Sequence, residues 1–220
     1  MISTAGATHI ADRAIGCPRS KLLSMGTQPK DRVTPEEYLA RELVAETKSE
    51  YFNGEVFAMA GASPAHVLIT TNVTAGLHGQ LRKQDCRVYS ADLRVKIPAA
   101  TSYAYPDVVV VCGAPRFSDE QKDTLLNPRL IIEVLSASTE EWDRSGKFEH
   151  YRSIESFAEY VVIAQDRVYA EHWLRQPDGT WKFSATHRLG DTIELESIGA
   201  RLALADAYEK VDLSGSASAA

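Results

Sequence analysis

The pattern of hydrophobic and polar positions predicts a mixed β-sheet flanked by helices. Two runs, residues 105–112 and 129–135, are almost continuously apolar, which is typical of central strands covered on both faces. Helical signals begin at Thr34 and at Ser63, because each is a capping residue followed by proline and then by apolar positions at helical spacing. We therefore expect one domain that combines α and β elements.

The remaining segments follow the same two periodicities. Asn53-Gly54 lies between two short β segments and is a strong signal for a hairpin turn, and Asp178-Gly179 is a second one. We expect helices over residues 34–44, 64–84, 139–154 and 202–208, a loop over 98–104, and strands over 51–57, 87–97, 105–112, 129–135, 160–164, 168–174, 180–187 and 192–195.

The two ends of the chain differ from its middle. Residues 1–32 show no sustained periodicity and are rich in Ala, Gly, Ser and Thr, so we expect a flexible leader there. This leader has no apolar run long enough for a secretory signal peptide. The last residues are of low complexity, which predicts a disordered tail over 211–220. The folded domain is then expected over residues 33–210.

Composition and charge narrow the class of protein. The 220 residues are 44% hydrophobic and 25% charged, as in an average soluble globular protein, which excludes wholesale disorder and coiled coil. The longest apolar run, residues 108–112, is far shorter than the roughly 18–20 residues that span a bilayer, so no membrane association is expected. The net charge of −6 argues against a partner held by bulk positive charge alone.

The three cysteines are sparse and scattered. Cys17, Cys86 and Cys112 form no Cys-x-x-Cys spacing, so a cysteine-ligated zinc is not expected. An odd and widely spaced set also argues against a disulfide scaffold and for a reducing compartment. The sequence therefore predicts a cytoplasmic protein.

Two carboxylates stand where strands should be apolar. Asp107 precedes four valines and Glu133 lies in Leu-Ile-Ile-Glu-Val-Leu, and burying an unpaired carboxylate costs several kcal/mol. If the two strands are antiparallel neighbours, a register that sets Asp107 opposite Glu133 centres the connection within the polar stretch 113–127. The pair then predicts a shared divalent metal, with one buried salt bridge for each acid as the alternative.

The helix expected after Glu133 contains a lysine that could lie near the two carboxylates. Asp143, Lys147 and Tyr151 are spaced at i, i+4 and i+8, so they share one helix face. A lysine and a tyrosine on that face could reach the carboxylates. An exposed Asp–Lys pair on the helix surface is the alternative, and from this spacing alone it is the favoured interpretation.

Several further polar residues are accessory candidates. Glu55 in the hairpin and His66 in the first turn of the next helix could extend a metal site or contact a phosphate. Asp92 could support the site or lie in a turn. Glu50 is expected to be a solvated cross-strand charge.

A local basic segment is compatible with two interpretations. Five basic residues oppose two acids between positions 82 and 96. They could form a solvated face or a surface that contacts a nucleic-acid backbone. The residues are Arg82, Lys83, Arg87, Arg94 and Lys96.

These segments together resemble a known family. Tyr-Pro-Asp ending at Asp107, the stretch Asn-Pro-Arg-Leu-Ile-Ile-Glu-Val-Leu-Ser-Ala-Ser-Thr over residues 127–139, and the Asp…Lys…Tyr helix resemble the Uma2 family of nucleases in the PD-(D/E)XK superfamily. The resemblance covers roughly residues 33–208 and implies an α/β (α+β) fold with a restriction-endonuclease-like core. The superfamily lysine would stand at position 135, where this chain has Leu135, so Lys147 is implied as its displaced equivalent.

The resemblance implies a metal-dependent endonuclease acting on nucleic acid, with DNA the expected substrate and a homodimer one arrangement it allows. Asp107, Glu133 and the carbonyl of Val134 would hold Mg²⁺ or Mn²⁺. Lys147 would orient water or stabilise charge on the phosphate, and Tyr151 would position Lys147 or touch the phosphate. A catalytically silent protein that binds nucleic acid or a protein partner is the alternative, and a metal hydrolase for a small phosphoester is a third.

Overall fold

The computed structural model describes residues 1, 32–59, 61–118, 122–136 and 139–213. Most of the predicted leader and tail therefore lies outside the described residues, and so does Cys17, so the expected flexibility of both ends stays a prediction. All the elements below belong to the unit that starts at Arg32. The arrangement is α+β with a mixed central sheet, as expected from the resemblance.

The larger sheet has six strands in the order β11-β10-β9-β8-β6-β3. Strands β8 and β9 are parallel, whereas the other neighbours are antiparallel, so the sheet is mixed. The two almost continuously apolar runs become β6 and β8, which lie inside the sheet because both of their faces are covered. The strands are β3 (Cys86–Ser90), β6 (Val108–Cys112), β8 (Leu130–Leu135), β9 (Glu159–Ala164), β10 (Ala170–Arg175) and β11 (Trp181–Thr186).

A second sheet of five strands has the order β2-β1-β5-β4-β7. The Asn53-Gly54 hairpin joins β1 to β2, and both turn residues have positive φ, which Asn and Gly adopt most readily. The segment 98–104, predicted to be a loop, instead contains a short helix and a strand, because its backbone pairs with β4 and β1. The strands are β1 (Ser49–Phe52), β2 (Glu55–Ala58), β4 (Arg94–Ile97), β5 (Ser102–Ala104) and β7 (Thr124–Leu125), with a separate ladder of β12 (Thr192–Leu195) and β13 (Ala200–Ala203).

The two N-terminal helices begin where the capping signals predict. Thr34 and Ser63 each accept a hydrogen bond from the third backbone N–H of their helix. The helix after β8 differs from expectation, because its first part is a π-helix, a form that is frequent at functional sites. The helices are α1 (Pro35–Glu42), α2 (Pro64–Leu81), η1 (Ala99–Thr101), the π-helix η2 (Trp142–Lys147), α3 (Phe148–Tyr151) and α4 (Leu204–Ala207).

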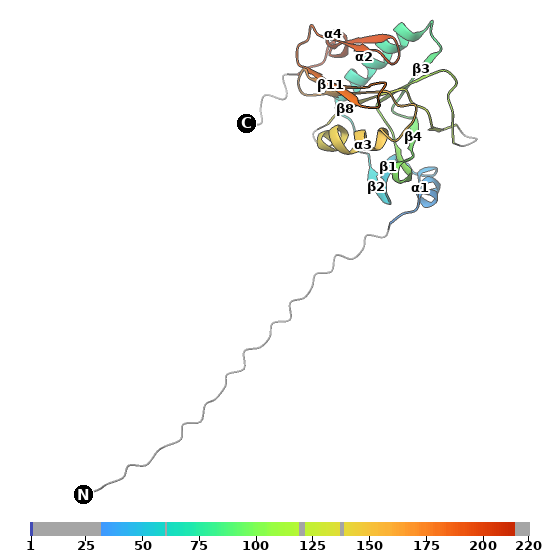
Figure 1. Ribbon diagram of the computed structural model, residues 1–220, viewed down its shortest axis with the longest axis vertical. Coiled ribbons are helices and arrows are strands. Elements are labelled where there is room, and N and C mark those ends of the chain that lie inside the picture. The colour runs from blue at the N-terminus through green and yellow to red at the C-terminus, as the bar shows by residue number, and fades with distance from the viewer. Residues whose placement is uncertain (2–31, 60, 119–121, 137–138, 214–220) are drawn as a thin grey trace. The chain divides into compact units, whose positions relative to one another are not determined.

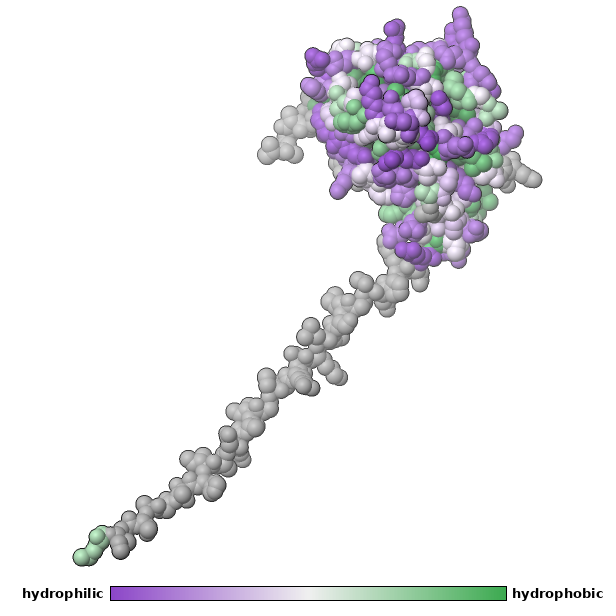
Figure 2. All heavy atoms as spheres, viewed as in Figure 1, coloured by the Kyte–Doolittle hydropathy of each residue, from purple (hydrophilic) through white to green (hydrophobic). Residues whose placement is uncertain are grey.

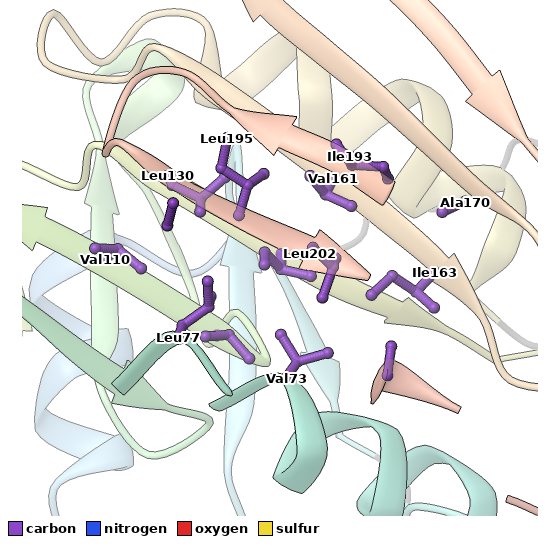
Figure 3. Packing of buried hydrophobic residues seen from close by; sticks show 14 of the residues in the cluster. Val73, Leu77, Val110, Leu130, Val161, Ile163, Ala170, Ile193, Leu195 and Leu202 are labelled. Carbon is purple, nitrogen blue, oxygen red and sulfur yellow. The ribbon is translucent and has the colours of Figure 1, made fainter. Parts of the chain in front are cut away.

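One face of the six-stranded sheet is covered by α2, α4 and the β12–β13 ladder. Figure 3 shows side chains from the sheet, from α2 and from the ladder meeting in one apolar cluster. Alternate residues of β8, namely Leu130, Ile132 and Val134, point into this cluster. Burial of these side chains on one face holds the sheet against α2.

The opposite face of the sheet is covered by η2, α3 and the five-stranded sheet (Figure 1). Ile131 and Leu135 of β8 pack there with Phe148 and Tyr151. Because side chains alternate along a strand, Glu133 points to this second face, between Ile131 and Leu135. The register of β8 thus places a carboxylate directly beneath the π-helix.

The surface is mainly polar on the face that Figure 2 shows, with smaller apolar areas between the charged side chains. Among the residues that the structure describes, none of the helices is both long and apolar enough to cross a bilayer.

A disulfide joins Cys86 of β3 to Cys112 of β6, a bond that was not predicted from the sequence, whose scattered cysteines argued against a disulfide scaffold. The two cysteines are direct partners in the antiparallel register, with their Cα atoms 4.0 Å apart. Sequence spacing could not show this, because 26 residues separate them along the chain. The argument for a reducing compartment rested on unpaired cysteines and therefore does not hold.

We expect reduction of this disulfide to lower thermal stability. A cross-link that closes a loop of this length stabilises a fold by about 3 kcal/mol, mainly by restricting the unfolded chain. Thermal unfolding with and without dithiothreitol should therefore show a lower Tm for the reduced protein. A Cys86→Ser/Cys112→Ser double variant is the matched control, and its Tm should not respond to dithiothreitol. Equal Tm values for oxidised and reduced wild type would contradict the expectation.

Candidate active site

The register of β6 and β8 brings Asp107 and Glu133 together. Val108 pairs with Ile132, and the same register extended by one residue sets Asp107 opposite Glu133. Asp107 lies just before β6 rather than within it, so the alternation of side chains along the strand does not fix the direction of its side chain. The backbone N–H of Asp107 donates to Glu133 Oε2 over 3.3 Å. The register expected from the sequence is therefore present, and it brings the backbone of Asp107 to the Glu133 carboxylate.

The carboxylate of Asp107 replaces a missing strand partner. β6 pairs with β8 only as far as Ile132, and the N–H of Val134 instead donates to Asp107 Oδ2 over 2.7 Å. The other oxygen, Oδ1, lies 2.8 Å from Nε2 of His66 in the first turn of α2. Asp107 is thus held in one orientation by a strand on one side and a helix on the other.

Lys147 lies at the centre of the cluster. Its ammonium is 3.0 Å from Glu50 Oε1, 3.3 Å from Glu133 Oε1 and 3.1 Å from Asp143 Oδ1, and its side chain is only 7% exposed. Asp143 and Lys147 both belong to the π-helix η2, which directs them to the sheet. The exposed Asp–Lys pair considered as the alternative is therefore not what forms.

Tyr151 contacts Glu133 rather than the outside of the site. Its hydroxyl donates to Glu133 Oε1 over 2.9 Å, and its side chain is fully buried in the second core. The roles considered for Tyr151, positioning Lys147 or contacting a phosphate, stay predictions. The contact that the structure shows is the one with the Glu133 carboxylate, which it orients.

Glu50 belongs to the cluster, and the expectation of a solvated charge is wrong. It is buried on β1, where Oε1 contacts Lys147 and also accepts the backbone N–H of Tyr105 over 3.1 Å. A local signal existed, because Glu50 and Phe52 are two residues apart and therefore point to the same face of β1. Only the docking of the small sheet on η2 makes that face a buried one.

Three other predicted residues lie outside the cluster. Glu55 is exposed at the start of β2. Asp92 has an 87% exposed side chain that forms an ion pair with Lys48. Arg94 is buried, where it donates to Tyr105 and Asp123, so the basic segment is not one continuous solvated stripe.

Burial and neighbouring charges together shift the pKa values of Glu133, Lys147 and His66. Burial raises the pKa of Glu133 well above its usual value, and although Lys147 opposes this, the Asp143 and Asp107 carboxylates add to it. Burial alone would lower the pKa of Lys147, but the surrounding carboxylates raise it by more, so the ammonium stays charged. Burial also opposes protonation of His66, yet its hydrogen bond to Asp107 leaves the pKa of His66 raised.

The donor set fits a hard divalent cation with incomplete protein coordination. Three carboxylates contact one lysine, and Asp143 Oδ1 is buried without a hydrogen bond among the described residues, although Lys147 lies nearby. Within the described ranges, no three His, Cys, Asp or Glu side chains are grouped as a ready-made metal site. Mg²⁺ commonly takes only one or two carboxylates from a protein and keeps several waters, so a site built on two carboxylates is compatible with this chemistry.

Comparison with known proteins relates this cluster to a nuclease family. The model of the Uma2 family, described as "Putative restriction endonuclease", matches residues 35–205. Two relatives from Synechocystis, the uncharacterized proteins sll1609 and slr1290, are 37% and 34% identical. The aligned regions cover 74% and 80% of this chain and 92% and 91% of the relatives. The resemblance drawn from the motifs is thereby confirmed.

A solved structure shares the fold. The crystal structure of a putative nuclease belonging to DUF820 from Anabaena variabilis superposes with a TM-score of 0.67, covering 80% of this chain and 97% of that one. Its sequence is 16% identical, so this likeness concerns the fold alone. It confirms the restriction-endonuclease-like core.

We expect Glu133→Gln to stabilise the metal-free protein increasingly as pH rises. The pKa of Glu133 is 4.5 in the unfolded reference and higher in the fold, so the folded chain binds the extra proton between these values. The contribution of Glu133 to the stability of the wild type then falls as pH rises through that window, and the variant lacks this loss. Thermal unfolding in EDTA, from about pH 4.5 to about pH 8, measures the difference in Tm.

Glu194→Gln, an exposed change on β12, is the control and should show a difference that does not vary with pH. A Glu133→Gln variant that instead loses Tm at neutral pH would show that the ion pair with Lys147 outweighs the cost of burying the Glu133 charge.

Proposed function

Because the chain belongs to the Uma2 family of restriction-endonuclease-like proteins, we propose that it is a metal-dependent endonuclease that hydrolyses phosphodiester bonds in DNA. Membership of a nuclease family concerns the general activity. The metal and the DNA substrate are our proposal, and they rest on the chemistry of the buried cluster.

The convergence of two carboxylates and one ammonium is the observation that supports this proposal. Asp107 and Glu133 come from adjoining strand positions, and Lys147 reaches Glu133 from the next helix. Phosphodiester hydrolysis asks a protein mainly for positioning and for electrostatic stabilisation, and these three groups can supply both. A lysine at position 135 is not required, because Lys147 brings an ammonium to the same carboxylate.

Asp107 and Glu133, with the carbonyl of Val134, are the groups that would hold Mg²⁺ or Mn²⁺. Such an ion supplies a water of lowered pKa and neutralises charge on the phosphate. His66 and the Val134 N–H fix the two oxygens of Asp107, and Tyr151 fixes Glu133. The carboxylates are therefore preorganised by the chain itself.

We assign to Lys147 the role of stabilising the negative charge that develops on the phosphate during hydrolysis. An ammonium has three N–H donors, and three carboxylates lie within 3.3 Å of this one. One of these contacts must give way when the ammonium engages a phosphate oxygen or the attacking water. Its burial strengthens the interaction, because charges act more strongly where water is excluded.

A small-phosphoester hydrolase is less well supported than an endonuclease. Such an enzyme needs an enclosed pocket at the cluster. A cavity of about 450 Å³ lies between β10, β11 and β12, with His172, Lys182 and Arg188 in its lining and none of the cluster residues. A catalytically silent nucleic-acid-binding protein is the alternative that the cleavage experiment decides.

We expect plasmid cleavage by the wild type with Mg²⁺ or Mn²⁺ and none with EDTA. Asp107→Asn, Glu133→Gln and Lys147→Met should each lower the cleavage rate by at least about 100-fold, because the first two weaken the proposed metal site and the third removes the ammonium that acts on the phosphate. Gel electrophoresis of supercoiled plasmid over time measures the rate, and circular dichroism checks that each variant is folded.

Glu194→Gln should cleave at the wild-type rate, since its carboxylate is exposed on β12. Cleavage that persists in EDTA, or three site variants as active as the parent, would refute the mechanism. A folded wild type that binds DNA and never cleaves it would favour the silent alternative.

A further inference from the structure

Two exposed aromatic side chains stand beside the cluster. Phe57 on β2 is 44% exposed and Trp142 on η2 is 36% exposed, and their rings are nearly parallel, at 25° with centroids 6.4 Å apart. Phe52, which is buried, packs edge-on against both rings. We call Phe52, Phe57 and Trp142 the aromatic ledge. Large exposed aromatic surfaces are the informative exception on a protein surface.

The ledge is built on the same elements as the cluster. Phe57 is the direct cross-strand partner of Glu50, so both side chains lie on one face of the β1–β2 hairpin. Trp142 immediately precedes Asp143 on the π-helix. A ligand whose phosphate lies at Lys147 would therefore pass close to the ledge.

The backbone holds the ledge in a fixed orientation. A Cβ atom at position 146 would overlap the indole ring of Trp142, so Gly146 leaves the space in which this ring lies against the helix. Phe52 contacts the indole edge with a centroid distance of 5.1 Å and an interplanar angle of 84°. Rings held in this way lose little conformational entropy when a ligand stacks on them.

We propose that the ledge binds an unpaired nucleobase next to the scissile phosphate, so that the preferred substrate is single-stranded or locally unpaired DNA. This inference rests on the proposed nuclease function, because it uses the cluster to position the phosphate. Aromatic rings bind bases of any sequence through their faces. In a duplex those faces are covered by neighbouring base pairs, so the ledge can engage only a base that is out of the stack.

Binding by a cleavage-deficient protein tests the ledge separately from catalysis. In a Glu133→Gln background, we would measure the Kd of a fluorescent single strand of about 20 nucleotides and of the blunt duplex of the same sequence. Phe57→Ala and Trp142→Ala should each weaken single-strand binding by about 5-fold to 150-fold, as expected for loss of one stacked base. Duplex binding should stay unchanged.

Matched variants separate stacking from general apolar contact. Phe57→Tyr keeps the ring and should bind like the parent, whereas Phe57→Leu keeps an apolar side chain and should bind as weakly as Phe57→Ala. Phe183→Ala removes another exposed phenylalanine, on β11, and should have no effect. Circular dichroism and Tm confirm that each variant is folded.

Several results would overturn the inference. These are unchanged single-strand affinity in the alanine variants, tight binding by Phe57→Leu, or an equal loss on duplex. A wild-type dimer that Phe57→Ala dissociates while nucleic-acid binding persists would identify a second copy of the chain as the true occupant. Plasmid cleavage by the wild type reports on the nuclease function itself, so neutral ledge variants in an active enzyme would refute the ledge alone.

Discussion

The ion pairs of the Lys147 ammonium connect the main parts of this fold. It contacts Glu50 from the five-stranded sheet, Glu133 from the six-stranded sheet and Asp143 from its own π-helix. A buried charge is tolerated only when it is paired, so the two sheets and the helix must meet at this point with good geometry. The same contacts hold the groups that we propose as the catalytic ones.

The cluster is stable because two apolar cores surround it. Leu130, Ile132 and Val134 anchor β8 on the α2 side, and Ile131 and Leu135 anchor it on the η2 side. Glu133 is a charged side chain among the apolar residues of β8, and its burial raises its pKa. Residues that make a site functional often reduce the stability of the fold that carries them.

In our proposal, Lys147 takes the role of the superfamily lysine from a different element of the fold. Leu135 packs in the second core, where the superfamily pattern has its lysine. The π-helix restores an ammonium to Glu133 from the other side of the same core, with Tyr151 one turn further along. An extra residue in a helical turn re-aims side chains, which is a physical reason for π-helices at functional sites.

The sequence by itself determined most strands of the central sheet, the starts of the two N-terminal helices and three members of the cluster. Asp107 and Glu133 interrupt apolar runs, and Lys147 shares a helix face with Asp143 and Tyr151. Only the tertiary structure decided that Glu50 is buried, that Asp92 is exposed and that distant cysteines face each other across two strands. These outcomes depend on which segments meet in space. Contacts between distant segments leave no periodicity along the chain, whereas local burial does.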